Sequence, residues 1–367
     1  MDKCCQVLMK YFLIKNCQIA NRQENNLDIL IANNKIIAIG KNLSCPTVNT
    51  STFDAEKYLV VPGFVNICSP FISLSNTEEK RRLIHDDIAG GYTTWIGTET
   101  ATNMMQTLST LGKQDIHTLN YSFHFDVDHF KHGDLNKMKS LSVTYGLPSM
   151  LYSITGIETA QNDRIDLFVA TAAQNNLLLI FSLIHNNSNA DEILEALKII
   201  SKRIDNAKCR TLFANVRYAE EIDIISKLRN NNDIYAQICL DINAIAPSNI
   251  TLIDGQMMIS MLRENKWICA DIISPDGSAQ KRIAQSFEIC QKCNIEESEL
   301  VEYMNTRKCQ ITGLAPAKGE IRIGADADIC IIKKGKIRAV IQNGKLTYDD
   351  GIMHENINGM QAFRRII

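Results

Sequence analysis

Short apolar runs alternate with helix-length amphipathic stretches through the middle of the 367-residue chain. Strands are predicted at 177–183, 210–216 and 234–240, and the stretches at 191–204 and 219–229 between them predict helices. Strands joined through a helix run parallel, with right-handed crossovers. The alternation therefore predicts a parallel sheet with helices packed on it, and it fits a closed barrel and an open sheet equally well.

Short β segments lie outside this body at both ends of the chain. Residues 27–31 and 35–40 flank Asn33-Asn34, a pair that tolerates the positive φ of a hairpin turn. Near the other end, residues 337–341 and 345–348 flank Asn343-Gly344. Because the α/β body separates the two segments in sequence, we expect them to meet in one composite β domain beside it.

The composition is that of a globular protein, with 45% hydrophobic and 22% charged residues, and the length allows one barrel-sized core plus a smaller domain. A formal net charge of −2 gives no electrostatic reason to expect nucleic acid or an anionic membrane as a partner. The 12 cysteines are scattered, many in apolar runs, which is typical of buried thiols in a reducing compartment. No apolar run reaches the length of a membrane span, so we expect a cytoplasmic protein.

Three segments carry a recognisable pattern. Pro62-Gly63-Phe64 leads into a strand-like run, Ala89-Gly-Gly-Tyr-Thr-Thr94 forms a glycine turn before the next strand, and Gly313–Ile329 contains Lys318-Gly-Glu-Ile-Arg-Ile-Gly324-Ala-Asp-Ala-Asp328. In this order they resemble the amidohydrolase superfamily, and its dihydroorotase branch in particular. The resemblance implies a TIM-like (β/α)8 barrel of regular or distorted shape over residues 62–319. It also implies a small composite β-sandwich domain from residues 1–61 and 320–367.

The resemblance also implies a zinc site, in which the metal lowers the pKa of a bound water and polarises the amide carbonyl. Its ligands are a His-x-His pair on the first strand, a bridging lysine, two further histidines and an aspartate; an arginine and an asparagine contact substrate. The aligned residues here are Cys68 and Pro70 for the pair, Met150 or Ser149 for the lysine, Ser182 and Asn215 for the histidines, Pro275 for the aspartate, and Ile72 and Thr100 for the substrate contacts. His185 follows Ser182 closely, but one residue off the alternation needed to share its face.

Replacement of the whole set predicts a pseudoenzyme with no intact catalytic residue, no metal and no cofactor. The resemblance implies a role for such a chain, because in some bacteria inactive dihydroorotase homologues assemble with aspartate transcarbamoylase as a structural subunit of pyrimidine biosynthesis. We therefore expect a homo-oligomer or a hetero-oligomer with that enzyme.

Two alternatives stay open. The segment that carries metal-capable side chains most densely contains His124, Asp126, Asp128, His129 and His132; it is either a solvated loop or a rebuilt zinc site of an active cyclic amide hydrolase. A small-molecule sensor that uses the old pocket is the other alternative, although Ile72 and Thr100 lack the usual contacts and we expect no such binding. Asp271, predicted on the strand face of Cys269, is interpreted as a salt-bridged acid or an acid at the barrel mouth.

Overall fold

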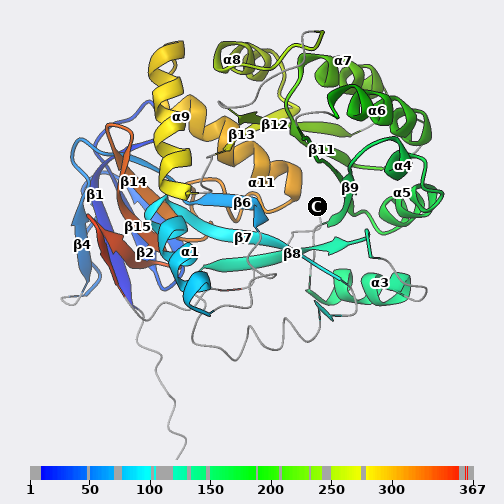
Figure 1. Cartoon of the computed structure of the whole chain (residues 1–367). Helices are drawn as coiled ribbons and strands as arrows, with labels where there is room; N and C mark the ends of the chain where they lie inside the picture. Colours follow the sequence, from blue (N-terminus) through cyan, green and yellow to red (C-terminus); the bar gives the residue numbers. More distant parts are fainter. Residues whose placement is uncertain are drawn as a thin grey trace, which may run out of the picture.

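Eight parallel strands form a curled sheet in which each strand lies beside the one that precedes it in the chain. The structure, a computed structural model, describes residues 10–47, 50–69, 77–100, 103–104, 119–129, 134–145, 149–186, 189–205, 209–230, 233–241, 249–273, 278–354, 360 and 362. The strands are β6 (Phe64–Ser69), β7 (Tyr92–Glu99), β8 (Asn120–Asp126), β9 (Ser149–Ile154), β10 (Leu178–Leu183), β11 (Thr211–Val216), β12 (Ile234–Asp241) and β13 (Ile268–Ile273). The predicted TIM-like barrel is confirmed in this curled form (Figure 1).

Helices cover the outer face of this sheet (Figure 1). They are α1 (Thr77–Ala89), α3 (Asp134–Tyr145), α4 (Ile157–Ala160), α5 (Arg164–Gln174), α6 (Ala190–Ile204), α7 (Ala219–Lys227), α8 (Gly255–Glu264), α9 (Ala279–Cys293) and α10 (Glu297–Val301); a short 3-10 turn, η2 (Leu228–Asn230), follows α7. The π-helix η3 (Glu302–Thr306) and α11 (Arg307–Thr312) follow α10 and contact β6 and β13 instead. In α6 the buried residues Ile193, Leu197 and Ile200 recur at helical spacing, which gives the helix one apolar face. That face packs on outward-facing strand residues such as Phe181 and Phe213, whose rings stack at 5.6 Å. None of the described helices is long and apolar enough to cross a membrane.

Alternate residues of each strand face the barrel interior. Leu151, Ile180 and Leu212 belong to an inner cluster, whereas Met150 packs in the outer layer under the helices. The helix α11 packs against the inner cluster through Cys309. Met150 therefore does not share the barrel interior, and of the two candidates for the lysine position only Ser149 lies on the inner face with Leu151.

Side chains close the gap between the first and last strands of the barrel. Among the described residues no strand pairing joins β13 to β6. Instead Asn305 of η3 accepts a hydrogen bond from the Val65 amide at 3.1 Å and donates to the Gly63 carbonyl at 3.0 Å. Arg307 donates to the main-chain oxygens of residues 262, 265 and 268, each at 2.9 Å. Asn305 thus satisfies backbone groups at the start of β6, and Arg307 satisfies carbonyls at the end of α8 and the start of β13.

The strands from the two chain ends form one nine-stranded sheet. They are β1 (Tyr11–Ile19), β2 (Leu27–Ala32), β3 (Lys35–Gly40), β4 (Ser51–Asp54), β5 (Leu59–Pro62), β14 (Ile329–Lys333), β15 (Lys336–Gln342), β16 (Lys345–Asp349) and β17 (Ile352–Met353). The ends meet where β5 pairs antiparallel with β14. Both predicted hairpins form, with positive φ at Asn33 (54°) and at Asn343 and Gly344 (50° and 74°).

Pro62-Gly63-Phe64 joins this β domain to the barrel. The Gly63 amide donates to the Asp328 carbonyl at 2.8 Å, and the next residue starts β6. A Cβ on Gly63 would lie 2.4 Å from Thr93 Oγ1, so only glycine fits at this position. The Asp328 carboxylate accepts hydrogen bonds from buried Lys318 and from Asn120, the first residue of β8, at 2.9 Å from Asn120 Nδ2. The joint is thus held by backbone and side-chain bonds together.

Candidate functional site

Three inner side chains form a hydrogen-bonded row near the C-terminal ends of β10, β11 and β12. Asn215 Nδ2 donates to Ser182 Oγ at 2.9 Å, and Cys239 Sγ donates to Asn215 Oδ1 at 3.4 Å. Active sites of α/β barrels lie at this end of the strands. The two positions aligned with the missing histidines, Ser182 and Asn215, are therefore brought together, and they bind each other.

A bulge in β11 turns Asn215 inward. Its φ is 64°, in the left-handed region, and the β11–β12 register shifts between Phe213 and Val216. Ala214 packs in the inner cluster and Val216 in the outer one, so the bulge places both Ala214 and Asn215 on the inner side. Asparagine is among the few residues other than glycine that tolerate this backbone conformation.

A buried ion pair lies beside this row. Lys308 Nζ of α11 is 2.6 Å from Asp271 Oδ2 of β13, and the side chains are 1% and 11% exposed. Gln237 Nε2 donates to the same oxygen at 3.4 Å, and Asp271 is the β13 partner of Cys239. Burial alone lowers the pKa of Lys308, but the adjacent Asp271 carboxylate outweighs it and raises that pKa above its ordinary value. Asp271 is thus the salt-bridged acid of the two interpretations, neutralised by a lysine distant in sequence.

His124 is fully buried in the barrel interior with both ring nitrogens engaged. Nε2 lies 2.7 Å from the Ile67 carbonyl oxygen, and Nδ1 contacts the Ser149 hydroxyl. A carbonyl only accepts, so Nε2 carries the proton and Ser149 donates to Nδ1. Burial lowers the pKa of His124 to about 4, and the bond to Ile67 offsets this only in part. The neutral ring therefore has no lone pair left for a metal.

The other described members of the histidine-rich segment point elsewhere. His129 is 77% exposed and pairs with Asp126 Oδ2 at 3.0 Å, and this hydrogen bond raises the pKa of His129. Asp128 accepts a hydrogen bond from the Ser153 amide at 2.8 Å. His132 lies outside the described residues. His124 is buried inside the barrel, Asp126 is the last residue of β8 with a side chain 18% exposed, and Asp128 and His129 lie in the exposed turn that follows. Among these described residues no three metal-capable side chains are arranged to hold one ion.

His185 follows β10 and binds the first turn of α7. Its Nε2 donates to Glu221 Oε1 at 2.7 Å, with side chains 1% and 0% exposed. Glu221 also accepts from the amides of Arg217 and Tyr218 at the start of α7, and the Tyr218 ring packs on the His185 ring at 5.4 Å. The glutamate in the first turn of α7 was the sequence signal for this cap, but its histidine partner could not be inferred from it.

Of the remaining aligned positions, the structure describes Thr100 and the backbone of Cys68. Thr100 follows β7 directly, and its carbonyl and hydroxyl accept hydrogen bonds from the amide of Asn103. Cys68 lies in β6, and its side chain is outside the described set. Pro70, Ile72 and Pro275 lie outside the described residues.

These donors do not fit the zinc centre that the resemblance implies. Protein zinc sites use thiolate, imidazole and carboxylate ligands in sets of three or four. The inner row offers one thiol among neutral hydroxyl and amide groups, while the nearby Asp271 carboxylate is neutralised by Lys308. Among the described residues no group of three or more His, Cys, Asp and Glu side chains is arranged to hold a metal ion.

Comparison with known proteins finds similar folds among solved structures and no match by sequence. No protein-family model matches the sequence. No curated protein sequence matches it either. Among solved structures, a dihydropyrimidinase from Brevibacillus agri has a TM-score of 0.76 and 16% identity, covering 97% of this chain and 100% of its own. An L-hydantoinase (dihydropyrimidinase) from Arthrobacter aurescens has a TM-score of 0.77 and 14% identity, with coverage of 97% and 100%.

A beta-aspartyl dipeptidase from Fervidobacterium islandicum has a TM-score of 0.69 and 15% identity, with coverage of 94% and 98%. These structural neighbours are members of the amidohydrolase superfamily. At such low identity the likeness is one of fold, and it extends over nearly the whole chain. The chain therefore has the amidohydrolase-type fold, barrel and β domain together, that its sequence motifs predicted.

Proposed function

We propose that this chain is a cytoplasmic, catalytically inactive relative of the dihydroorotases that acts as a structural partner of aspartate transcarbamoylase in pyrimidine biosynthesis. The observation that carries the inactivity is the row Ser182–Asn215–Cys239, in which groups at the expected ligand positions bind one another. A hydrolase of this kind needs unpaired, basic donors at these positions to hold a metal.

Two further features support inactivity. Lys308 supplies the positive charge beside Asp271, a carboxylate on the inner face of the last barrel strand. His124 is held neutral between Ile67 and Ser149. The alternative, a zinc hydrolase based on His124, Asp126, Asp128, His129 and His132, therefore lacks a set of metal ligands that point to one position among the members that the structure describes. A buried lysine–aspartate pair and a buried, hydrogen-bonded neutral histidine are both typical of a protein interior and not of an open metal site.

The partner is inferred from the resemblance. Inactive members of the dihydroorotase branch assemble with aspartate transcarbamoylase in some bacteria, and a chain that keeps the whole fold without its chemistry matches that role. The intact joint at Gly63 and the side-chain bridge at Asn305 support it, because a scaffold needs the architecture alone.

Co-expression with the aspartate transcarbamoylase of the same genome tests the partnership. We expect the two chains to co-elute in size-exclusion chromatography, with a molar mass by light scattering above that of either protein alone. An active dihydroorotase from the same genome, if one is encoded, serves as the competitor. Elution as two separate peaks at protein concentrations well above micromolar would contradict the proposed role as a structural partner.

Isothermal titration with dihydroorotate and carbamoyl aspartate tests the sensor alternative. Since the inner polar groups bind one another, we expect no heat of binding from either compound. Saturable binding of either without turnover would favour a sensor over a scaffold.

A further inference from the structure

Near the N-terminal end of the barrel strands, two residues from the end of the chain pair with β8. The strand β7 lies on one side of β8, but on the other side β9 begins only at Ser149, opposite His124. Beside the earlier part of β8, the Tyr121 amide donates to the Met360 carbonyl at 3.0 Å, and the Ala362 amide donates to the Tyr121 carbonyl at 2.7 Å. This is the pattern of a parallel β pairing. We call Met360 and Ala362 the C-terminal latch.

Asn120 connects the latch to the joint between the β domain and the barrel. The Met360 amide donates to Asn120 Oδ1 at 2.8 Å, and the same oxygen accepts a hydrogen bond from Asn343 Nδ2 at 2.9 Å. Asn120 Nδ2 donates to the carboxylate of Asp328, whose carbonyl binds the Gly63 amide. Asn343 lies in the turn between β15 and β16, so one buried side chain contacts the latch, a β-domain turn and the joint.

The latch is attached weakly compared with the core. Ala362 is 5% exposed and packs in the inner cluster, but its side chain is only a methyl group. Met360 is 48% exposed, and its sulfur accepts one long contact, from Asn34 Nδ2 at 3.6 Å. Segments with few buried apolar groups open locally at a lower free energy than the molecule as a whole. The latch therefore has the features of a segment that opens before the core does.

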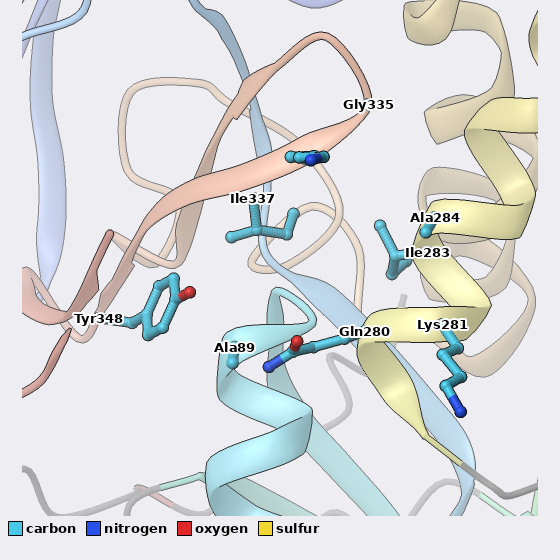
Figure 2. Close-up of a pocket in the computed structure, with 9 residues that line it drawn as sticks. Ala89, Gln280, Lys281, Ile283, Ala284, Gly335, Ile337 and Tyr348 are labelled. Atoms are coloured by element: carbon cyan, nitrogen blue, oxygen red, sulfur yellow. The ribbon is translucent and has the colours of Figure 1, made fainter. Parts of the chain in front are cut away.

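The two parts of the molecule are also held together elsewhere, by apolar packing. Ile88 of α1 and Phe287 of α9 share one core cluster with Val340 of β15. Figure 2 shows part of this contact, where Ile283 of α9 and Ile337 of β15 line one cavity from the barrel helices and from the β domain. Neither latch residue belongs to this cluster. Opening of the latch therefore leaves this contact between the two parts in place.

We propose that the C-terminal latch is a releasable device that closes the N-terminal end of the barrel. Met360 and Ala362 leave Tyr121 together while the rest of the chain stays folded. Their release frees the amide and the carbonyl of Tyr121 and removes two of the residues that line a cavity of about 260 Å³ beside Lys318. It also takes one hydrogen bond from Asn120 and so loosens the turn between β15 and β16. The latch does not involve the barrel mouth, so it stands whether or not the chain is catalytic.

Native-state hydrogen exchange of the full chain tests the release. At low urea concentrations we expect the amides of Tyr121 and Ala362 to report the same opening free energy, because one event frees both. Corrected for intrinsic rates, both should exchange about 100-fold or more faster than the Leu179 amide of β10, which donates to the Arg210 carbonyl at 2.9 Å. Exchange of the first two amides only in global unfolding, together with Leu179, overturns the latch. Unequal opening free energies for Tyr121 and Ala362 overturn it as well.

Ala362→Asp tests the latch by displacing it. A carboxylate cannot stay unpaired in the inner cluster, so we expect the Tyr121 amide to exchange about tenfold or more faster while Leu179 is unchanged. Ala170→Asp, at an exposed position on α5, is the matched control and is expected to change neither. Unchanged exchange at Tyr121, or equal acceleration at Tyr121 and Leu179, would contradict a segment that opens on its own.

The coupling through Asn120 has its own readout. The Asn343 amide donates to Asp328 Oδ1 at 2.9 Å, and we expect it to exchange about threefold or more faster in Ala362→Asp than in the wild type or in Ala170→Asp. An Asn343 amide that exchanges equally in all three proteins would show that the latch does not act on the β domain.

Discussion

Asn215 Nδ2 lies 2.9 Å from Ser182 Oγ, and this hydrogen bond joins the two inner-face positions at which the amidohydrolase resemblance implies histidines. The bulge at Asn215 and the approach of Cys239 extend the row across three strands. These mutual contacts stabilise the C-terminal end of the barrel strands.

Replacing Asn215 tests the bulge and the hydrogen bond separately. Asn215→Ala loses the bond to Ser182 and puts at a φ of 64° a residue that lacks the polar side chain with which asparagine tolerates this conformation, so we expect a loss of about 2–3 kcal/mol in unfolding free energy. Asn215→Gly tolerates the backbone and loses the bond alone, for about 1 kcal/mol. Urea denaturation of both variants gives the comparison, and equal losses would show that the backbone is not strained.

The ion pair of Lys308 and Asp271 is tested by removing one charge and then both. Lys308→Met leaves a buried carboxylate without its counter-charge, for an expected loss of about 4 kcal/mol. Adding Asp271→Asn to Lys308→Met is expected to recover most of that loss, because no isolated charge remains. Losses that simply add in the double variant would contradict a direct pairing of the two groups.

Asn305 binds backbone groups at the start of β6, on the edge of that strand for which no pairing to β13 is seen among the described residues, so its loss should loosen this edge. Asn305→Leu keeps the volume but leaves the Val65 amide and the Pro62 and Gly63 carbonyls unpaired, for an expected cost of about 3 kcal/mol. Amide hydrogen exchange at Val65 should accelerate more than exchange in β10. Unchanged protection at Val65 would show that this edge is held by other contacts.

His124 predicts a specific pH dependence. Its folded pKa of about 4 lies below the ordinary value of 6.5, so between these pH values the unfolded chain binds more protons and stability falls as pH decreases. From pH 7 to pH 5 this removes about 2 kcal/mol, a loss that His124→Gln should not show. Asp87, whose pKa burial raises to about 7, acts in the opposite direction over the same interval.

The difference between wild type and His124→Gln isolates the histidine, because Asp87 contributes equally to both proteins. The advantage of the wild type in unfolding free energy should therefore shrink on acidification to pH 5. A difference that stays constant from pH 7 to pH 5 would show that His124 titrates normally.

The fold could be predicted because its turns and strands follow rules that act over a few residues. The site could be predicted only in part, because it depends on contacts between residues that are distant in sequence. The turns at Asn33 and Asn343 and the glycine at position 63 follow from backbone rules that act over a few residues. Ser149 and Met150 differ by one position, and in a strand that step moves a side chain from the inner to the outer face. Lys308 lies 37 residues beyond its partner Asp271, a separation that periodicity cannot bridge.

The bulge at Asn215 is a second feature that the sequence pattern could not predict. A strand pattern assumes strict alternation, whereas the extra residue turns two successive side chains inward. Asparagine within an apolar run is a weak signal of such a bulge, because the same residue occurs in strands that alternate regularly.

The central claim, a fold kept without its chemistry, is tested most directly by measuring metal content and dihydroorotate hydrolysis on the same purified sample. After expression with added zinc and removal of loosely bound metal, we predict well under one zinc per chain by mass spectrometry and no hydrolysis above the buffer rate. About one or two zinc ions per chain, as metal-dependent hydrolases hold, together with turnover that a chelator abolishes, would contradict the account.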